Sequence, residues 1–194
     1  MGIKVCKFGG TSMADAKAIR QVESIVRADK DRRYVVVSAP GKRFKDDIKI
    51  TDLLYKCYRE ALETGKCAEY FAPVRERFKE IAADLGLKFD IDAVLDETEY
   101  AIAANTESAD FAASRGEYLS ARIAAELLGY KFVDATEIIR FDSRGNLNQA
   151  YTEDKIKTVL DGVEYAVIPG FYGKNSYGKI KTCLLYTSDA ADDR

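Results

Sequence analysis

The residues with the clearest chemical potential stand at the start of the chain. Residues 7–12 read Lys-Phe-Gly-Gly-Thr-Ser and follow an apolar run, Ile3 to Cys6, that is typical of a buried strand. This order predicts a strand, a two-glycine turn and then a helix. Backbone N–H groups at a helix start can approach a phosphate closely where glycine provides no Cβ, and Lys7 adds a full positive charge. The segment therefore suits phosphate chemistry.

Other interpretations of this segment stay open. Ser12 followed by Asp15 has the spacing of a capping box, which would start the helix at about Met13. The segment is not a Walker loop, in which the lysine follows the glycines, and it is not G-x-G-x-x-G. A tight turn with a surface lysine explains it as well. The rest of the chain must decide between a phosphate site and an ordinary turn.

Composition excludes several classes of protein. The 194 residues suffice for one domain with a sizeable core, or for a large part of a bigger one. The 30 basic and 32 acidic residues give a net charge of −2, which indicates neither a nucleic-acid partner nor a membrane surface. No apolar run reaches the roughly 20 residues of a membrane span, and no signal peptide is recognisable. We therefore expect a cytoplasmic globular protein.

Histidine is absent, so the chain cannot carry Ser-His-Asp or Cys-His catalysis. Proton transfer would have to use carboxylates, lysine or tyrosine. None of the cysteines has C-x-x-C spacing, which argues against a zinc site and favours reduced thiols. The cysteines are Cys6, Cys57, Cys67 and Cys183.

Strand-like and helix-like runs alternate along the chain. Strands are predicted near residues 34–38, 131–134 and 165–168, a turn at 142–148, and helices over 14–29, 51–62, 71–85, 90–104 and 108–128. Such alternation predicts a largely parallel sheet with helices on both faces. The segments after the strands, which include Ser38–Pro40 and Pro169–Phe171, should then meet at one sheet edge. Gly116 lies inside the last helix at a cost of ~1 kcal/mol against alanine, which implies a packing or binding reason.

Four segments together resemble one known family, across residues 1–182. They are residues 7–12; Val-Val-Val-Ser-Ala at 35–39 with Thr-Asp-Leu-Leu at 51–54; Ser-Arg-Gly-Glu-Tyr-Leu-Ser-Ala at 114–121; and Val-Ile-Pro-Gly-Phe-Tyr-Gly at 167–173. They resemble, in order, the N-terminal signature, the Ser-Ala and Thr-Asn-Leu segment, the Gly-Glu-x-Leu-Ser segment and the Gly-Phe-x-Gly segment of aspartate kinases.

The resemblance implies both a fold and a reaction. The fold is α/β, a three-layer αβα sandwich with a mainly parallel sheet, known as the amino-acid kinase fold. The reaction moves the γ-phosphoryl of ATP to the β-carboxylate of L-aspartate, giving 4-phospho-L-aspartate on the way to lysine, threonine and methionine. Mg²⁺ would accompany ATP, held mainly by phosphate oxygens and water. The aspartate carboxylate is already ionised near neutral pH, so no general base is needed. The resemblance also implies a homo-oligomeric parent protein.

The family's motifs imply roles for individual residues. Lys7 would be catalytic, because phosphoryl transfer depends on positive charge at the transferring group. Glu117 would pair with the substrate ammonium. The implied phosphate-binding residues are Lys7, Gly9, Gly10, Thr11 and Ser12; the implied aspartate-binding residues are Ser38, Thr51 and Glu117; no residue is implied as a metal ligand.

Structural explanations for some of these residues stay open. Glu117 could be a solvent-facing helix carboxylate, and Thr51 is expected to be a helix N-cap as well as a ligand. Arg115 and Arg122 are interpreted as surface or salt-bridge residues. The charged loop 42–49 is longer than the family's glycine-rich version, so we expect a flexible flap that could lie over nucleotide phosphates.

The resemblance ends at Thr182. The family continues with a segment like Gly-Arg-Gly-Gly-Ser-Asp, whose arginine grips the substrate carboxylate, and then with the adenine and ribose site. Residues 183–194 resemble a translated sequencing adapter instead. We therefore expect a partial amino-acid kinase domain at 1–182 and a non-native tail at 183–194. Such a truncated chain should have little or no kinase activity and should expose an unpaired sheet edge and apolar helix faces.

Two competing functions remain. One is another enzyme of the same fold, acting on glutamate or a nucleotide; residues 7–12 with Thr51 and Glu117 speak against it. The other is a non-catalytic module that binds aspartate or a partner subunit. The continuation of the parent gene would distinguish this module from an enzyme.

Overall fold

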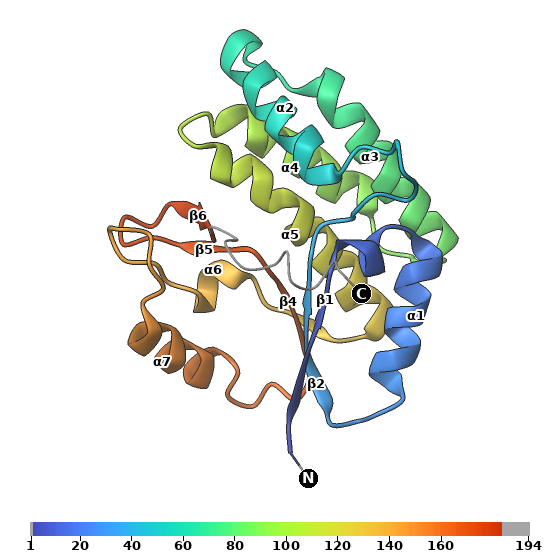
Figure 1. Cartoon of the computed structure of the whole chain (residues 1–194), viewed down its shortest axis with the longest axis vertical. Helices are drawn as coiled ribbons and strands as arrows, with labels where there is room; N and C mark the ends of the chain where they lie inside the picture. The colour runs from blue at the N-terminus through green and yellow to red at the C-terminus, as the bar shows by residue number, and fades with distance from the viewer. Residues whose placement is uncertain (1, 184–194) are drawn as a thin grey trace.

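Four parallel strands form the centre of the fold (Figure 1). The computed structural model describes residues 2–183, and residues 184–194 of the predicted tail lie outside this range. The elements in chain order are β1 (Lys4–Phe8), the 3₁₀ helix η1 (Gly10–Met13), α1 (Ala16–Arg27), β2 (Arg32–Val37), α2 (Ile50–Thr64), α3 (Ala68–Asp84), α4 (Ile91–Ala104), α5 (Ala109–Leu128), β3 (Lys131–Phe132), α6 (Ala135–Ile138), α7 (Gln149–Val159), β4 (Ala166–Pro169), β5 (Tyr172–Lys174) and β6 (Ile180–Thr182).

The strand register brings three loops together. The sheet order is β1-β2-β4-β3, and its neighbouring strands all run parallel. Phe8 pairs with Val37, and Val37 pairs with Pro169, so β1, β2 and β4 end at the same level. The segments that follow these strands therefore meet at one edge of the sheet, as predicted. Parallel α/β sheets place their ligands at this carboxyl edge.

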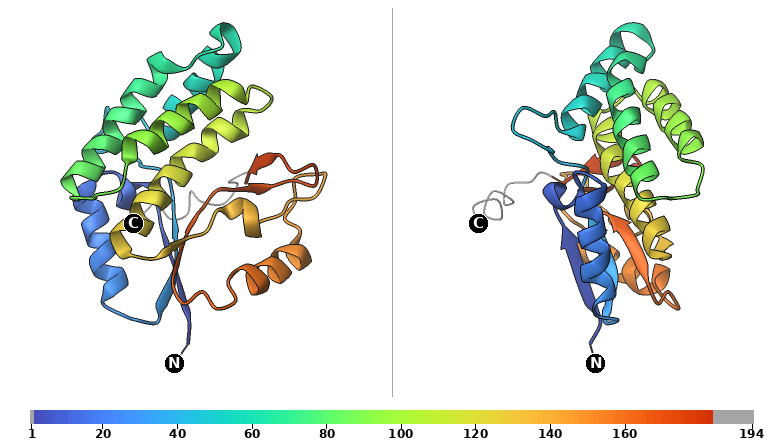
Figure 2. Two further views of the ribbon diagram at one scale, coloured as in Figure 1. Left: turned by 180° about the vertical axis from the view of Figure 1, so that it is seen from behind. Right: turned by 90° about the vertical axis from the view of Figure 1, so that its right-hand side faces the viewer.

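Side chains of β2 alternate between two apolar layers. Val35 and Val37 belong to a cluster with buried residues of all five helices from α1 to α5, whereas Tyr34 and Val36 pack against a second cluster with residues of α6 and α7. Strand side chains point alternately to opposite faces, so helices lie on both sides of the sheet, although those on the side of Tyr34 and Val36 leave part of that face open. This confirms the predicted α/β sandwich, and the two further views in Figure 2 show the sheet between its helices.

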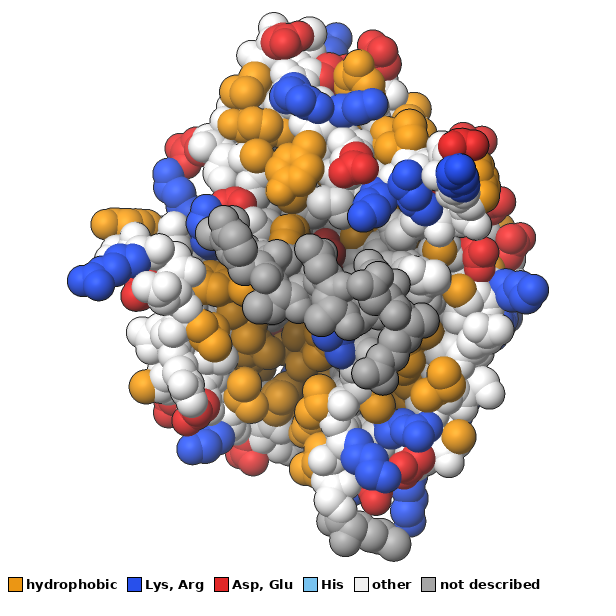
Figure 3. Space-filling model, in the orientation of Figure 1, with side chains coloured by type: hydrophobic (Ala, Val, Ile, Leu, Met, Phe, Trp, Pro, Cys, Tyr) orange, Lys and Arg blue, Asp and Glu red, His pale blue; other side chains and the backbone are white. Residues whose placement is uncertain are grey.

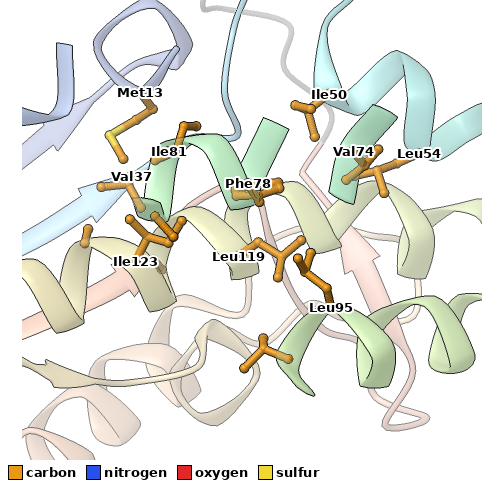
Figure 4. Packing of buried hydrophobic residues seen from close by; sticks show 14 of the residues in the cluster. Met13, Val37, Ile50, Leu54, Val74, Phe78, Ile81, Leu95, Leu119 and Ile123 are labelled. Carbon is orange, nitrogen blue, oxygen red and sulfur yellow. The ribbon is translucent and has the colours of Figure 1, made fainter. Parts of the chain in front are cut away.

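A bundle of α2, α3, α4 and α5 lies beyond the carboxyl ends of the strands (Figures 1 and 2). Figure 4 shows its fully buried side chains interlocking: Leu54 from α2, Phe78 from α3, Leu95 from α4 and Leu119 from α5. Met13, which follows the glycine turn, joins the same cluster. The bundle is thus packed directly against the segment with the most suggestive sequence. None of the helices within residues 2–183 has the length and apolar character needed to cross a membrane.

Two helix starts differ from the prediction. The first α-helix begins at Ala16, where the Asp15 carboxylate accepts from the Ala18 N–H at 2.8 Å, so the predicted Ser12–Asp15 capping box is wrong. α2 begins at Ile50 after Lys49, so Thr51 is not an N-cap. The extended backbone that a cap requires occurs instead at Asp15, three residues after Ser12, and at Lys49, two residues before Thr51. The elements α6, α7, β5 and β6 were not predicted.

One face of the sheet remains open to an apolar hollow of about 540 Å³. Its lining includes Val5, Val36, Ile168 and Phe171 (Figure 3 shows hydrophobic side chains gathered in this hollow). Val5 is 66% exposed on β1, which has a neighbour on one side only in the described sheet. An edge strand that exposes apolar side chains is a template for association.

We expect Val5→Lys to reduce self-association of the chain, because a lysine on an edge strand opposes pairing with another chain. The measurement is sedimentation velocity over a concentration series, together with fluorescence of a dye that binds apolar surface. The matched control is Ile25→Lys on α1, where the wild-type side chain is 47% exposed and lies outside the hollow. A monomeric wild-type chain at all concentrations, with a sharp unfolding transition, would contradict the expectation.

Candidate active site at the carboxyl edge of the sheet

The loops after β1 and β2 are joined backbone to backbone. Ser38 N–H donates to the Phe8 carbonyl at 3.1 Å, and Gly41 N–H donates to the Gly10 carbonyl at 2.8 Å. A Cβ on Gly41 would lie 2.8 Å from the Gly10 carbonyl carbon, and a Cβ on Gly10 would lie 3.2 Å from the Ala39 oxygen. Only glycine permits this approach without displacement. The two glycine positions therefore bring residues 9–12 beside residues 38–41.

The predicted phosphate-binding segment is an exposed turn. Lys7, Gly9 and Thr11 are exposed at the end of β1, while Gly10 and Ser12 are half-buried. η1 follows in place of the predicted α-helix start, and Ser12 N–H donates to the Gly9 carbonyl at 3.1 Å. The N-terminal N–H groups of any helical turn lack intrahelical acceptors. Available donors thus follow Lys7 directly in the chain, but the dipole of a long helix does not contribute there.

Gly116 brings α5 against the loop after β2. A Cβ added to Gly116 would lie 2.7 Å from the Ala39 Cβ and 3.3 Å from Leu54 Cδ1. This close packing is the reason for a glycine inside α5 that the sequence left undefined. It also determines the position of the next residue, Glu117, relative to Ala39.

Gly116→Ala is expected to lower the free energy of unfolding by about 1–3 kcal/mol, because the added methyl group overlaps Ala39 in a packed core. The better helix propensity of alanine, worth about 1 kcal/mol, offsets part of this loss. Urea unfolding measures the effect. Gly9→Ala is the control, since a Cβ there meets no atom within 4 Å. Equal stabilities of Gly116→Ala and wild type would show that the contact is loose.

Glu117 is a buried carboxylate with spare hydrogen-bonding capacity. The residue is 6% exposed, and its Oε2 atom has no partner among the described residues. Burial raises the pKa of Glu117 to about 7, although the N–H groups of Ala39 and Glu117 and the charges of Lys7 and Arg115 oppose this shift. The alternative of a solvent-facing carboxylate is therefore wrong. An unsatisfied buried acceptor costs stability, so Glu117 is suited to a cationic donor.

Ser38 and Thr51 lie on either side of the same loop. Ser38 directly follows β2, and Thr51 is the second residue of α2. The N–H of Ile50, just before Thr51, donates to the Pro40 carbonyl at 3.4 Å, which attaches the start of α2 to this loop. Both side chains are half-buried. Ser38 and Thr51, two of the three predicted aspartate-binding residues, therefore lie at the two joined ends of the loop that contains Ala39, which packs against Gly116 beside Glu117.

The interpretation of Arg115 as a surface or salt-bridge residue is wrong. The residue is buried, and its guanidinium donates to Ser114 Oγ at 2.9 Å and lies 4.6 Å and 4.7 Å from the ring centroids of Phe111 and Tyr118. Tyr172, from the segment after β4, supplies a third ring at 5.4 Å. Cations are attracted to aromatic faces, so this contact joins α5 to β5. Arg115 pairs with no carboxylate among residues 2–183.

The third loop of the edge follows β4. Gly170 N–H donates to the Val37 carbonyl at 2.9 Å, and a Cβ on Gly170 would lie 3.2 Å from that oxygen. Phe171 has φ of 70°, a left-handed conformation that is uncommon for a non-glycine residue. Strained residues of this kind gather at binding sites, although the strain alone does not identify a ligand. The fourth sequence segment thus lies beside the second.

The charged loop 42–49 is attached to the bundle rather than free. The buried Asp47 carboxylate accepts from the backbone N–H groups of Arg43 and Ile48 and from the side chain of Arg77 on α3. These charged hydrogen bonds hold the pKa of Asp47 well below its usual range, with the Arg43 side chain as the largest cause. The expectation of a flexible flap is therefore wrong for the part of the loop around Asp47. Within residues 2–183, no group of three or more acidic or cysteine side chains could hold a metal ion, and the four cysteines are free.

Comparison with known proteins identifies the class. The profile described as "Amino acid kinase family" matches residues 2–191, so the chain belongs to this family. It is 32% identical to aspartokinase 3 of Bacillus subtilis (strain 168) over 202 residues, which cover 96% of this chain and 44% of that protein. The resemblance to aspartate kinases read from the four segments is confirmed.

Solved structures agree with this assignment. The structure of Clostridium acetobutylicum aspartate kinase superposes with a TM-score of 0.90 at 40% identity, covering 94% of this chain and 42% of that one. E. coli aspartokinase III in complex with aspartate and ADP gives a TM-score of 0.76 at 25% identity, covering 93% of this chain and 43% of that one. The chain therefore spans less than half the length of the relatives it matches.

Proposed function

We propose that the protein is the N-terminal part of an ATP-dependent kinase that phosphorylates the β-carboxylate of L-aspartate. The observation that carries the proposal is Glu117, a buried carboxylate whose Oε2 atom has no partner among residues 2–183 and whose pKa is influenced by the charge of the accessible Lys7, next to the glycine turn in the sequence. A buried acceptor suits the ammonium of an amino acid, and exposed donors next to it suit a phosphate. An amino-acid substrate and a phosphate would thus be adjacent.

The proposed roles follow from the positions of the residues. Lys7 neutralises charge on the transferring phosphoryl group, and Gly9, Gly10, Thr11 and Ser12 bind phosphate oxygens through the turn. Glu117 pairs with the substrate ammonium, while Ser38 and Thr51 bind aspartate from the loop that contacts α5. Phosphoryl transfer relies on positioning and electrostatic stabilisation, so this set needs no general base. The E. coli relative in complex with aspartate and ADP supports the two ligands.

The remaining chemistry comes from the substrates. ATP supplies the phosphoryl group, and Mg²⁺ is proposed to be held mainly through ATP phosphates and water. Formation of the product, 4-phospho-L-aspartate, is the first step toward lysine, threonine and methionine.

We propose a homo-oligomeric parent protein. We also propose that residues 1–182 are a partial amino-acid kinase domain and that the 194-residue chain alone has little or no activity, since its matched relatives are more than twice as long.

The test is an ADP-release assay with L-aspartate, with L-glutamate and with neither. It compares the 194-residue chain with the product of the parent gene read past codon 182. Aspartate-dependent release by the longer product supports the proposal, and equal rates without aspartate overturn it. Full activity of the 194-residue chain contradicts only the proposed inactivity. A natural stop codon after residue 194 favours the module that binds aspartate or a partner subunit, and preference for glutamate favours another enzyme of this fold.

A further inference from the structure

Arg77 on α3 is a buried cation whose contacts reach outside its own helix. The side chain is 4% exposed, and its Nη2 atom contacts both oxygens of the buried Asp47 carboxylate at 2.9 Å and 2.7 Å. Its Nη1 atom donates to the carbonyls of Gly41 at 3.3 Å and Ala14 at 3.4 Å. One guanidinium therefore contacts three separate places in the chain between residues 14 and 47.

These contacts involve both loops of the candidate site. Ala14 directly follows η1, so its carbonyl ends the segment that begins with the glycine turn. Gly41 belongs to the loop after β2, and its own N–H donates to the Gly10 carbonyl at 2.8 Å. Arg77 thus holds the far end of the first loop and the centre of the second, while Gly41 joins the two loops directly.

Asp47 extends this arrangement toward α2. Its carboxylate accepts from the Arg43 and Ile48 N–H groups and from the Arg43 side chain, so it determines the course of the loop that leads into α2. Thr51, a proposed aspartate-binding residue, lies only four positions further along the chain. Arg77 therefore connects α3 to Gly41, at the start of the segment between Gly41 and Thr51, and through the ion pair to Asp47 in its later part.

We propose that Arg77 is a positioning residue that holds the phosphate-binding loop and the aspartate-binding loop in fixed relation to each other. This inference rests on the proposed function, because it concerns loops to which that function assigns two substrates. Arg77 touches neither substrate; it acts through the Gly41 and Ala14 carbonyls and through Asp47. Arginine suits the role because a planar guanidinium can contact a carboxylate and two carbonyls at once, whereas a lysine ammonium is a single point of charge.

The first test is residue-resolved amide hydrogen exchange of the ligand-free chain in Arg77→Lys and Arg77→Met. The reporter is the Gly41 N–H, which donates to Gly10, and the reference is the Val133 N–H, which donates to Val167 in the sheet. Arg77→Lys keeps the charge opposite Asp47 but not both carbonyl contacts. We expect exchange at Gly41 to accelerate at least tenfold in Arg77→Lys, with less than a threefold change at Val133.

The matched control is Arg75→Met, two residues away on the same helix. Arg75 pairs with the surface carboxylates of Asp96 and Glu99 and contacts neither loop. The Arg75→Met variant should leave the ratio of the amide exchange rates at Gly41 and Val133 unchanged. The proposal is overturned if Arg77→Lys accelerates both amides equally, or leaves both at wild-type rates, because Arg77 would then stabilise the fold generally or not at all. It is also overturned if Arg75→Met reproduces the selective change.

The second test measures the affinity of the chain for L-aspartate by titration calorimetry. We expect Arg77→Lys to weaken binding at least tenfold and Arg75→Met to leave it unchanged. Equal affinities of Arg77→Lys and wild type would overturn the positioning role. Failure of the wild-type chain to bind aspartate counts against the proposed function instead, and hydrogen exchange then decides the role of Arg77 because that measurement needs no ligand.

Discussion

Lys7→Ala is expected to reduce the proposed phosphoryl transfer from ATP to aspartate by about 100- to 1,000-fold, the usual effect of removing one group that stabilises charge in a transition state. Lys7 is exposed at the carboxyl end of β1, directly before the glycine turn, and its charge already acts on Glu117 across the site. The effect should fall mainly on kcat, because charge on the transferring group changes most during the reaction. The measurement is aspartate-dependent ADP release by the product of the parent gene.

Lys4→Ala provides the matched control for this experiment. Lys4 lies on the same strand with an exposed side chain, but it pairs with Asp29 at the opposite end of β1. The Lys4→Ala substitution removes the same charge from the protein, but at a place away from the glycine turn. Kinase activity should therefore remain within about twofold of wild type. Equal losses in the two variants would mean that Lys7 acts through net charge rather than through its position.

Glu117 is expected to make the stability of the fold fall as the pH rises from about 5 to 8. Its pKa is about 7 in the folded chain and ordinary in the unfolded chain, so the folded state binds more protons in this interval. The stability that protonated Glu117 contributes is present at low pH and lost as the pH passes through 7. At about 1.4 kcal/mol per pKa unit, the full change is about 3 kcal/mol.

Urea unfolding at pH 5 and pH 8 measures this difference. Glu117→Gln should remove most of the pH dependence and raise stability at pH 8, because the amide needs no proton to stay neutral. Glu97→Gln on the exposed surface of α4 removes the same charge without burial and should keep the wild-type dependence. Asp47, whose pKa is lowered, acts in the opposite direction but only in more acidic solution, where it becomes protonated. Equal free energies of unfolding of the wild-type chain at pH 5 and pH 8 would refute the prediction.

The sequence predicted the parts of this fold that depend on local pattern. The β-branched run at 34–38 and the periodic helix at 108–128 appear as β2 and α5 with small shifts of their ends. The parallel order followed from alternation of strands and helices, and the meeting of the loops followed from the parallel order. The residues after the strands were therefore placed together correctly, although their roles remain predictions.

The features that could not be predicted from the sequence depend mainly on contacts between residues far apart in the chain. Arg77 looked like any charged residue on an amphipathic helix, and only the fold brings it 2.7 Å from Asp47. Arg115 was misread because three aromatic rings from different positions surround it. The start of α1 was misplaced because both Ser12 and Asp15 can cap a helix, and backbone conformation chose Asp15. The short strands β5 and β6 have too few residues to show a period.

The buried Glu117 carboxylate also has a consequence for the energetics of ligand capture. A ligand that places an ammonium group against Glu117 favours its ionised form, so capture at pH 6 must expel the proton that the empty site retains. As the pH is raised toward 7, the apparent affinity for such a ligand therefore increases by up to about tenfold per pH unit. Above pH 7 the affinity levels off. Titrations at pH 6 in buffers with different heats of ionisation would show this expelled proton directly. In the same buffers, Glu117→Gln would release none.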